Sequence, residues 1–146
     1  MAFEFVFLSD QFFNDYANCP QIEKKKSRPH IRLIIREEGL CFAIPMRSSI
    51  KHPYAFLTDR ANRCGIDYSK AVVIKDEALY IDRSRKPQIR QNEFNALKGK
   101  EAVVQSQFLR YLRAYRKAQR HPQAEHNKTL LAYSALQYFD DLLGSG

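Results

Sequence analysis

Apolar residues form short runs over the first half of the chain and recur at helical spacing over the second half. Residues 3–8 are apolar apart from one charge, which predicts a strand. Ser9 follows as a favourable N-cap, so we expect a short helix over residues 10–16. The chain is therefore predicted to begin with a strand and a helix.

A strong hairpin pattern comes next. Residues 31–35 and 40–44 are apolar runs on either side of Glu37-Glu38-Gly39, a turn signal, so we predict two antiparallel strands. Further short strands are predicted by composition, with a polar connection over residues 59–65. These strands are expected at residues 54–57, 71–74 and 79–81.

The period changes to that of a helix from Glu93 onward. A long helix is predicted up to Pro122, on apolar residues at Val104, Phe108, Leu112 and Tyr115. A last helix is expected from about residue 128 to 143. Strands followed by helices predict an α+β domain over residues 1–143, with a small bent antiparallel sheet covered on one side by helices. Residues 144–146 are interpreted as a flexible tail or a cloning scar.

Charge is the unusual feature of the composition. The chain has 24 Lys and Arg against 16 Asp and Glu among 146 residues, which gives a formal net charge of +8. Such an excess favours a polyanionic partner through long-range attraction and counterion release. Nucleic acid is the leading candidate, and an anionic membrane surface is the second.

Several classes of protein lack their signals here. No apolar run approaches the roughly 20 residues of a membrane span, and Glu4 and Asp10 do not fit a secretory signal. Three widely spaced cysteines form neither a disulfide framework nor a metal motif, which favours a reducing cytoplasm. Neither a nucleotide-binding glycine motif nor an acidic cluster for catalytic metals occurs, so we expect no metal and no cofactor.

The richest candidate chemistry follows the second hairpin strand, where Arg47, Ser48, Ser49, Lys51 and His52 lie within six residues. RNA can be cleaved without a metal if a protein orients the 2′-hydroxyl, neutralises the phosphoryl oxygens and supplies a proton to the leaving oxygen. These cations, hydroxyls and the imidazole are suited to those tasks. The alternative is that the serines are turn residues, Lys51 is a solvated charge and His52 is an ordinary capping imidazole.

Other polar residues are candidates for binding RNA. Lys70 is a candidate phosphate ligand or acid, and Asp67 is a candidate residue that shapes the site. A lysine in this position is more often a solvated strand-edge charge, and an aspartate there more often fixes a turn. His30 either lines a cleft beside the hairpin or is partly buried and hydrogen-bonded. His126 is assigned no role. Basic clusters that can follow a nucleic-acid backbone comprise Lys24, Lys25, Lys26, Arg83, Arg85, Lys86, Arg110, Arg113 and Lys117.

The segment from Arg28 to Ile81 resembles the toxins of type III toxin-antitoxin systems, the ToxN, CptN and TenpN group, and is most similar to the TenpN branch. The stretches Ile44 to Phe56 and Gly65 to Ile74 carry the resemblance. Better-known members have a Thr-Ser-Pro-Lys loop where this chain has residues 47–51, so the serine that matches each family hydroxyl stays open by one residue. The resemblance favours Ser48 and Lys51 as catalytic residues, with His52 as a candidate acid or base.

This resemblance implies a fold similar to the MazF and Kid ribonucleases, an SH3-like bent sheet elaborated by helices. It implies a cytoplasmic bacterial endoribonuclease that needs no metal, leaves a 2′,3′-cyclic phosphate, and is silenced by a small pseudoknotted RNA processed from a repeat transcript. We therefore expect RNA, and neither DNA nor a membrane, as the partner. A non-catalytic RNA-binding module that uses the same basic surface is the alternative.

Overall fold

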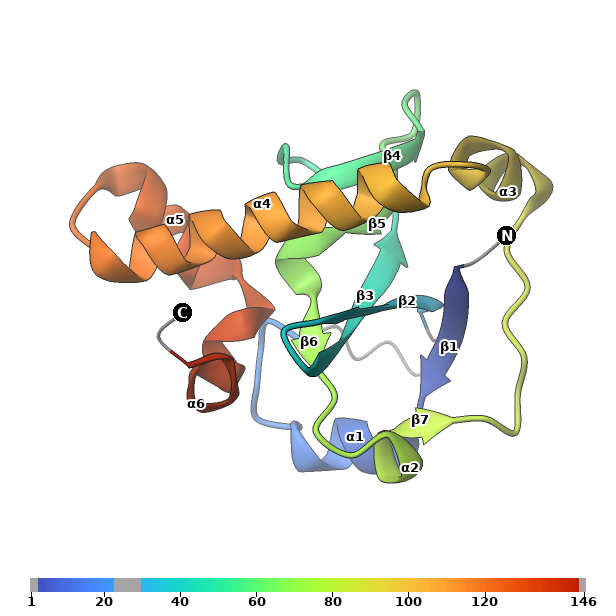
Figure 1. Ribbon diagram of the computed structural model, residues 1–146, viewed down its shortest axis with the longest axis horizontal. Helices are drawn as coiled ribbons and strands as arrows, with labels where there is room; N and C mark the ends of the chain where they lie inside the picture. Colours follow the sequence, from blue (N-terminus) through green and yellow to red (C-terminus); the bar gives the residue numbers. More distant parts are fainter. Residues whose placement is uncertain (1–2, 23–29, 145–146) are drawn as a thin grey trace.

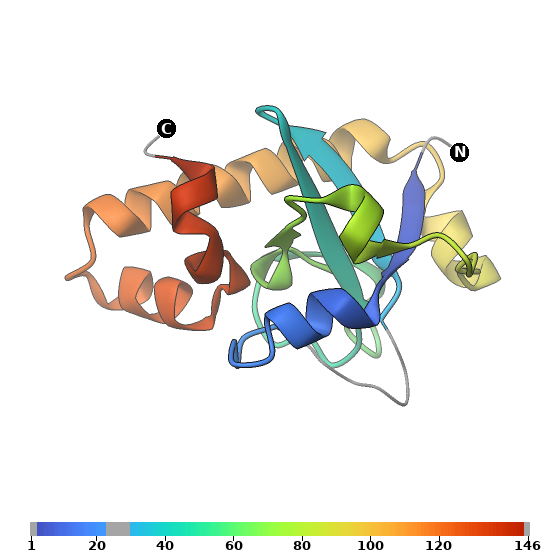
Figure 2. The same cartoon turned by 90° about the horizontal axis from the view of Figure 1, so that it is seen from below.

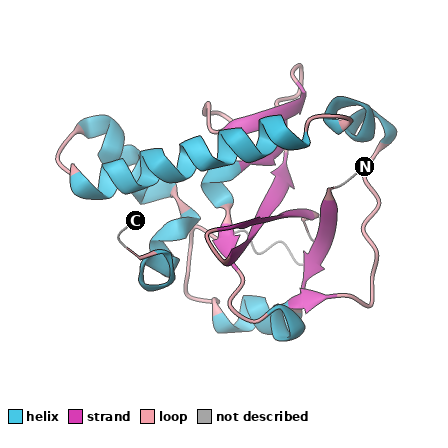
Figure 3. Ribbon diagram, viewed as in Figure 1, coloured by secondary structure: helices cyan, strands magenta, loops and turns pink. Residues whose placement is uncertain are grey.

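The computed structural model describes residues 3–22 and 30–144 and has an α+β architecture (Figures 1 and 3). Within these residues seven strands form one antiparallel sheet in the order β4-β5-β3-β2-β1-β7, and β6 pairs with β3. The strands are β1 (Glu4–Leu8), β2 (Arg32–Glu37), β3 (Leu40–Arg47), β4 (Ala55–Asp59), β5 (Cys64–Asp67), β6 (Val72–Val73) and β7 (Ile81–Asp82). The helices are α1 (Asp10–Asp15), η1 (Tyr68–Lys70), α2 (Glu77–Tyr80), α3 (Gln91–Leu97), α4 (Glu101–Arg120), α5 (Glu125–Tyr133), η2 (Ala135–Phe139) and α6 (Asp140–Leu143).

The predicted hairpin is confirmed as β2 and β3. Glu37 pairs with Leu40, which leaves Glu38 and Gly39 as a two-residue turn. Both turn residues have positive φ angles, 55° and 74°. This is the backbone of the tight turns that match the twist of the flanking strands. Ser9 also caps α1 as predicted, since its hydroxyl accepts a hydrogen bond from the amide of Phe12 at 3.3 Å.

Strand β3 organises the sheet because it pairs with three other strands. One edge carries β2, while on the other edge Phe42 and Ala43 pair with β6, and Met46 and Arg47 pair with β5. The prediction of a polar connection over residues 59–65 is wrong at its end, where β5 begins at Cys64. The consequence is that β5 lies directly against the carboxyl end of β3.

The helical region predicted from Glu93 onward is confirmed but divided: α3 ends at Leu97, and the long helix α4 begins at Glu101 and ends at Arg120, two residues before Pro122. Its buried side packs on the sheet, and the rings of Phe42 and Phe108 are 4.9 Å apart at a tilt of 69°. Figures 1 and 2 show α4 running along one side of the molecule and α1 with α2 on the opposite side. Among the described helices, none is long and apolar enough to cross a membrane.

Two predicted elements are wrong in part. Leu79 and Tyr80 belong to the short helix α2 instead of a strand, because Asp76 caps the turn by accepting from the amide of Leu79 at 3.1 Å. The predicted helix over residues 128–143 is broken at Ser134, which has extended backbone angles and starts η2. The shorter helix α5 lies beside η1, which directly follows β5.

Candidate functional site

The loop that follows β3 is held in place by the turn between β4 and β5. Ile50 anchors it, with only 2% of its surface exposed. The amide of Ser49 donates to the carbonyl of Asn62 at 3.3 Å, and that of Ile50 to the carbonyl of Arg63 at 3.0 Å. The Arg63 side chain returns two hydrogen bonds, to the carbonyls of Ile50 and His52. These hydrogen bonds and the burial of Ile50 hold the loop in one conformation.

A buried carboxylate lies beneath this loop. The side chain of Asp67 has no exposed surface, and its Oδ2 accepts from Nη1 of Arg47 at 2.7 Å. Its Oδ1 lies 3.1 Å from Nε2 of His52 and accepts from the hydroxyl of Ser69 at 2.6 Å. Burial alone would raise the pKa of this carboxyl, but the hydrogen bonds from His52, Ser69 and Arg47 outweigh burial and hold the pKa below its usual value. Asp67 therefore stays charged.

The strand register explains why these side chains meet. Arg47 pairs directly with Gly65, so Asp67 occupies the diagonal position on the neighbouring strand, within reach of a long side chain. The close approach of β4 requires Gly65, because a Cβ atom there would lie 2.0 Å from the carbonyl oxygen of Phe56. The glycine thus packs three strands tightly at the point where Arg47 leaves the sheet.

His52 has both of its ring nitrogens engaged. Nδ1 accepts a hydrogen bond from the backbone amide of Tyr54 at 3.1 Å, and an amide can only donate. The neutral ring therefore carries its proton on Nε2, which faces Asp67 and lies 3.1 Å from the hydroxyl of Ser69. To act as a general base, His52 would first have to break one of these hydrogen bonds. The geometry gives His52 a positioning role between the loop and Asp67.

Three other predicted residues of the loop point to solvent. Ser48, Ser49 and Lys51 are exposed, whereas Arg47 and His52 are partly buried. Ser49 also has a φ angle of 55°, which marks it as a strained turn position. The loop therefore presents exposed hydroxyls and an exposed amine between two residues that are fixed to Asp67.

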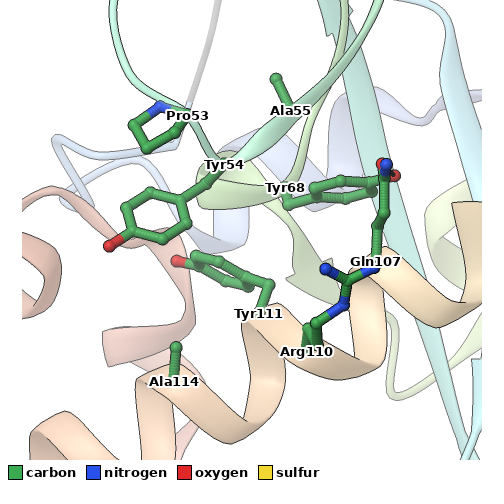
Figure 4. A pocket seen from close by; sticks show the side chains of 8 residues that line it. All are labelled: Pro53, Tyr54, Ala55, Tyr68, Gln107, Arg110, Tyr111 and Ala114. Atoms are coloured by element: carbon green, nitrogen blue, oxygen red, sulfur yellow. Dashed lines mark hydrogen bonds between the residues drawn. The ribbon is translucent and has the colours of Figure 1, made fainter.

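Two hollows open beside this loop and share Pro53, Tyr54 and Tyr111. The first has a volume of about 360 Å³ and is also lined by Tyr68, Gln107 and Arg110 from η1 and α4 (Figure 4). The second has a volume of about 380 Å³ and is otherwise lined by His52, Ser69, His126, Thr129, Leu130 and Tyr133. The rings of Tyr54 and Tyr111 meet edge to face at 5.5 Å. Aromatic surface thus borders the loop on two sides.

Lys70 and His30 both make contacts with the protein's own backbone. Nζ of Lys70 donates to Oε1 of Gln21 and to the carbonyl of Tyr133, both at 2.7 Å. Nδ1 of His30 lies 3.1 Å from the carbonyl of Met46, next to the start of the loop. His30 therefore fits the interpretation of a partly buried, hydrogen-bonded histidine, and Lys70 joins the segment after α1 to the end of α5.

The predicted basic clusters lie in different places. Arg110, Arg113 and Lys117 are exposed on α4, and Arg110 reaches the first hollow. Arg83, Arg85 and Lys86 follow β7, at the opposite edge of the sheet from β4. Arg83 is bonded there to Glu4 at 3.3 Å, and Arg85 to Asp82 at 3.0 Å. Lys24, Lys25 and Lys26 lie outside the described residues. The structure thus brings Arg110 of the α4 cluster to the hollow beside the loop and places the β7 cluster at the far edge of the sheet.

Sequence reasoning missed some residues of this site. Ser69 follows Asp67 by two positions, and the Asp67-x-Ser69 spacing is the signal of a capped turn, since the Ser69 amide also donates to Asp67 at 3.0 Å. His126 and Gln107 carry no sequence signal, because only the packing of α5 and α4 brings them to the hollows.

Comparisons of the chain with protein-family models, with curated proteins and with solved structures find no match. Among the described residues, no three His, Cys, Asp or Glu side chains are grouped so that they could hold a metal ion.

Proposed function

We propose that this protein is a metal-independent endoribonuclease, the toxin of a type III toxin-antitoxin system. The observation that carries the proposal is the loop after β3, in which exposed Ser48 and Lys51 stand between Arg47 and His52, both fixed to Asp67. A rigid loop with these side chains can bind a phosphate in one orientation, which is most of what RNA self-cleavage requires.

In the proposed reaction the 2′-oxygen loses its proton and bonds to phosphorus. The bond from phosphorus to the 5′-oxygen breaks and that oxygen gains a proton, so the products are a 2′,3′-cyclic phosphate and a 5′-hydroxyl. Arg47 and Ser48 are assigned to the phosphoryl oxygens, where a cation and a hydroxyl offset the growing charge. Both ring nitrogens of His52 are engaged in contacts within the protein. The two proton transfers of this reaction are therefore assigned to Lys51.

The proposal includes a fold of the MazF and Kid kind, an SH3-like bent sheet. The pairing of β3 supports this fold. Along one edge β3 pairs first with β6 and then with β5, as expected for a strand at which a sheet bends. Under this proposal the protein is bacterial and cytoplasmic, and a small pseudoknotted repeat RNA both inhibits it and is processed by it. The net charge of +8 is suited to such a folded RNA partner.

A non-catalytic RNA-binding module is the second candidate function. The arrangement of His52 favours it, because the loop then lacks an imidazole with a free nitrogen. The same basic and aromatic surface would serve both functions, so only a test for RNA cleavage distinguishes the enzyme from the binding module.

The test is mass spectrometry of the products after purified protein, freed of bound RNA, meets a mixed RNA in excess EDTA. Fragments that end in 2′,3′-cyclic phosphate are expected from the wild type and not from Ser48→Ala or Lys51→Ala. Ser106→Ala and Lys98→Ala change exposed residues outside the loop and serve as matched controls. Intact RNA in every sample, with binding retained, would mean that the protein is a binding module.

A further inference from the structure

The two hollows beside the loop form one surface with two compartments. Their linings share Pro53, Tyr54 and Tyr111, so the Tyr54–Tyr111 ring pair is the wall between them. His52 lines the second compartment and is bonded to Asp67, which also holds Arg47. The loop after β3 therefore adjoins both compartments, because Pro53 and Tyr54, which line both, follow His52 directly in the chain.

The walls of both compartments are aromatic. Tyr54 and Tyr111 contribute to both, Tyr68 closes the first, and Tyr133 borders the second with 60% of its surface exposed. Tyr68 and Tyr111 are each only 2% exposed, so the ring surface open to a flat ligand belongs to Tyr133 and to the partly buried Tyr54. The backbone of Tyr133 is tied down by Lys70, so the position of its ring is supported by a contact elsewhere in the fold.

Polar groups in the first compartment come from α4. In Figure 4, Arg110 and Gln107 extend from this helix toward Tyr68, and Oε1 of Gln107 accepts from the Tyr68 hydroxyl at 2.9 Å. A guanidinium can both stack on a base and donate to its edge. Ser69, His126 and Thr129 supply polar groups to the second compartment.

The charge of the residues around the two compartments indicates which class of ligand they bind. Among the described residues that line the two compartments there is no Asp or Glu. Arg110 lines the first compartment, and Arg113 and Lys117 lie exposed farther along the same helix. A cationic edge beside aromatic walls is complementary to a strand with negative phosphates and flat bases.

We propose that the two compartments are adjacent subsites for two consecutive unpaired bases of one RNA strand, whose backbone passes over Pro53 and Tyr54. This rests on the proposed function and deepens it, because it assigns base recognition to residues outside the loop. Tyr54 separates the two bases, Arg110 contacts the base in the first subsite, and Tyr133 covers the base in the second. A duplex is excluded by this geometry, since paired bases cannot enter both compartments.

The test compares two strands of equal charge that cannot be cleaved. One is a 2′-O-methyl RNA of random sequence, about 12 nucleotides long, and the other is the same strand without bases. Wild-type protein should bind the strand with bases at least about 10-fold more tightly, because stacking contributes to only one of them. Equal binding of the two strands would overturn the subsites without any mutation.

Single substitutions test which side chains cause the tighter binding of the strand with bases. Tyr54→Leu should weaken binding of the strand with bases about 10- to 100-fold and leave the abasic strand unchanged, whereas Tyr54→Phe should bind as the wild type does. Arg110→Met should weaken the strand with bases more than the abasic strand. Arg113→Met, on the same helix but outside the hollow, should weaken both equally. Equal effects of Arg110→Met and Arg113→Met would overturn the first subsite.

Cleavage of unmodified RNA is measured alongside. Base-dependent binding without cleavage would support the subsites and reject the proposed enzyme. Cleavage without base-dependent binding would reject the subsites and leave the proposed enzyme intact. Binding to neither strand would overturn the subsites.

Discussion

Nη1 of Arg47 lies 2.7 Å from Oδ2 of Asp67, a carboxylate with no exposed surface on its side chain. Removing one partner of a buried ion pair leaves the other desolvated and uncompensated, which costs more than the pair itself contributes. Arg47 is 26% exposed, so its charge could still reach water, but the loop would lose the contact that holds Arg47 to Asp67.

We therefore expect Asp67→Asn to lower the free energy of unfolding by about 1.5–3 kcal/mol at neutral pH, because the hydrogen bonds from His52, Ser69 and Arg47 lose their charged acceptor. Urea denaturation followed by circular dichroism measures this change. The control is Glu125→Gln, because this carboxylate is 90% exposed and its ion pair with Lys128 should contribute little. Equal stability of the two variants would contradict the anchoring role of Asp67.

The difference between the wild type and Asp67→Asn should depend on pH. The folded protein holds the pKa of Asp67 below its ordinary value, so the charged form stabilises the fold. This contribution is complete above the unfolded pKa of about 3.9 and is lost as the pH falls through the lower folded pKa. The contribution of Asp67 to the gap in unfolding free energy should thus shrink below about pH 4. A gap that widens in acid would contradict this assignment.

Local signals made part of this structure predictable. The β2–β3 hairpin follows from a turn sequence between two apolar runs, and α4 from apolar residues at helical spacing, because both depend on neighbours in the sequence. The loop from Arg47 to His52 was recognisable for the same reason, since its polar residues are contiguous.

The other features of the site could not be predicted, because they depend on contacts between residues that are far apart in the sequence. β5 contains Gly65 and ends at Asp67, residues that are unfavourable in strands, and it forms because β3 and β4 approach it from both sides. The pairing of Arg47 with Asp67 spans twenty positions and depends on that register. His126 reaches the second hollow because α5 packs against η1, a contact that no local sequence pattern shows.

Gly65→Ala should disrupt the junction of β3, β4 and β5. The new Cβ would meet the backbone carbonyl of Phe56 at 2.0 Å, and backbone cannot rotate away as a side chain can. We expect a loss of about 3 kcal/mol in the free energy of unfolding, at the upper end of overpacking effects.

The matched control for this prediction is Gly99→Ala. Gly99 has a φ angle of 73° and open space around it, so alanine there brings backbone strain without a clash. Its expected cost is about 1 kcal/mol. Thermal unfolding of the two variants gives the comparison, and a larger loss for Gly99→Ala would contradict the close approach of the strands.

Tyr111 and Ser134 should be energetically coupled. The Tyr111 hydroxyl donates to Oγ of Ser134 at 2.7 Å, and both side chains are buried. Ser134→Ala leaves that hydroxyl unpaired, at a cost of about 1–3 kcal/mol, and Tyr111→Phe leaves the serine without this donor. The double variant should cost less than the sum of the singles by about 0.5 kcal/mol or more in urea denaturation. Strict additivity would contradict the bond.

Lys70 and Lys117 should separate stability from RNA binding. Nζ of Lys70 makes two hydrogen bonds of 2.7 Å that join Gln21 to the carbonyl of Tyr133, whereas Lys117 is exposed on α4. Because hydrogen bonds to charged groups contribute about 1.5–3 kcal/mol, Lys70→Met should lower the free energy of unfolding by about that amount. Lys117→Met should leave stability unchanged and, under the proposed function, should weaken RNA binding and reduce its salt dependence. Urea denaturation and binding titrations at two salt concentrations measure both effects. Unchanged stability of Lys70→Met together with weaker RNA binding would make Lys70 an RNA ligand instead of a structural link.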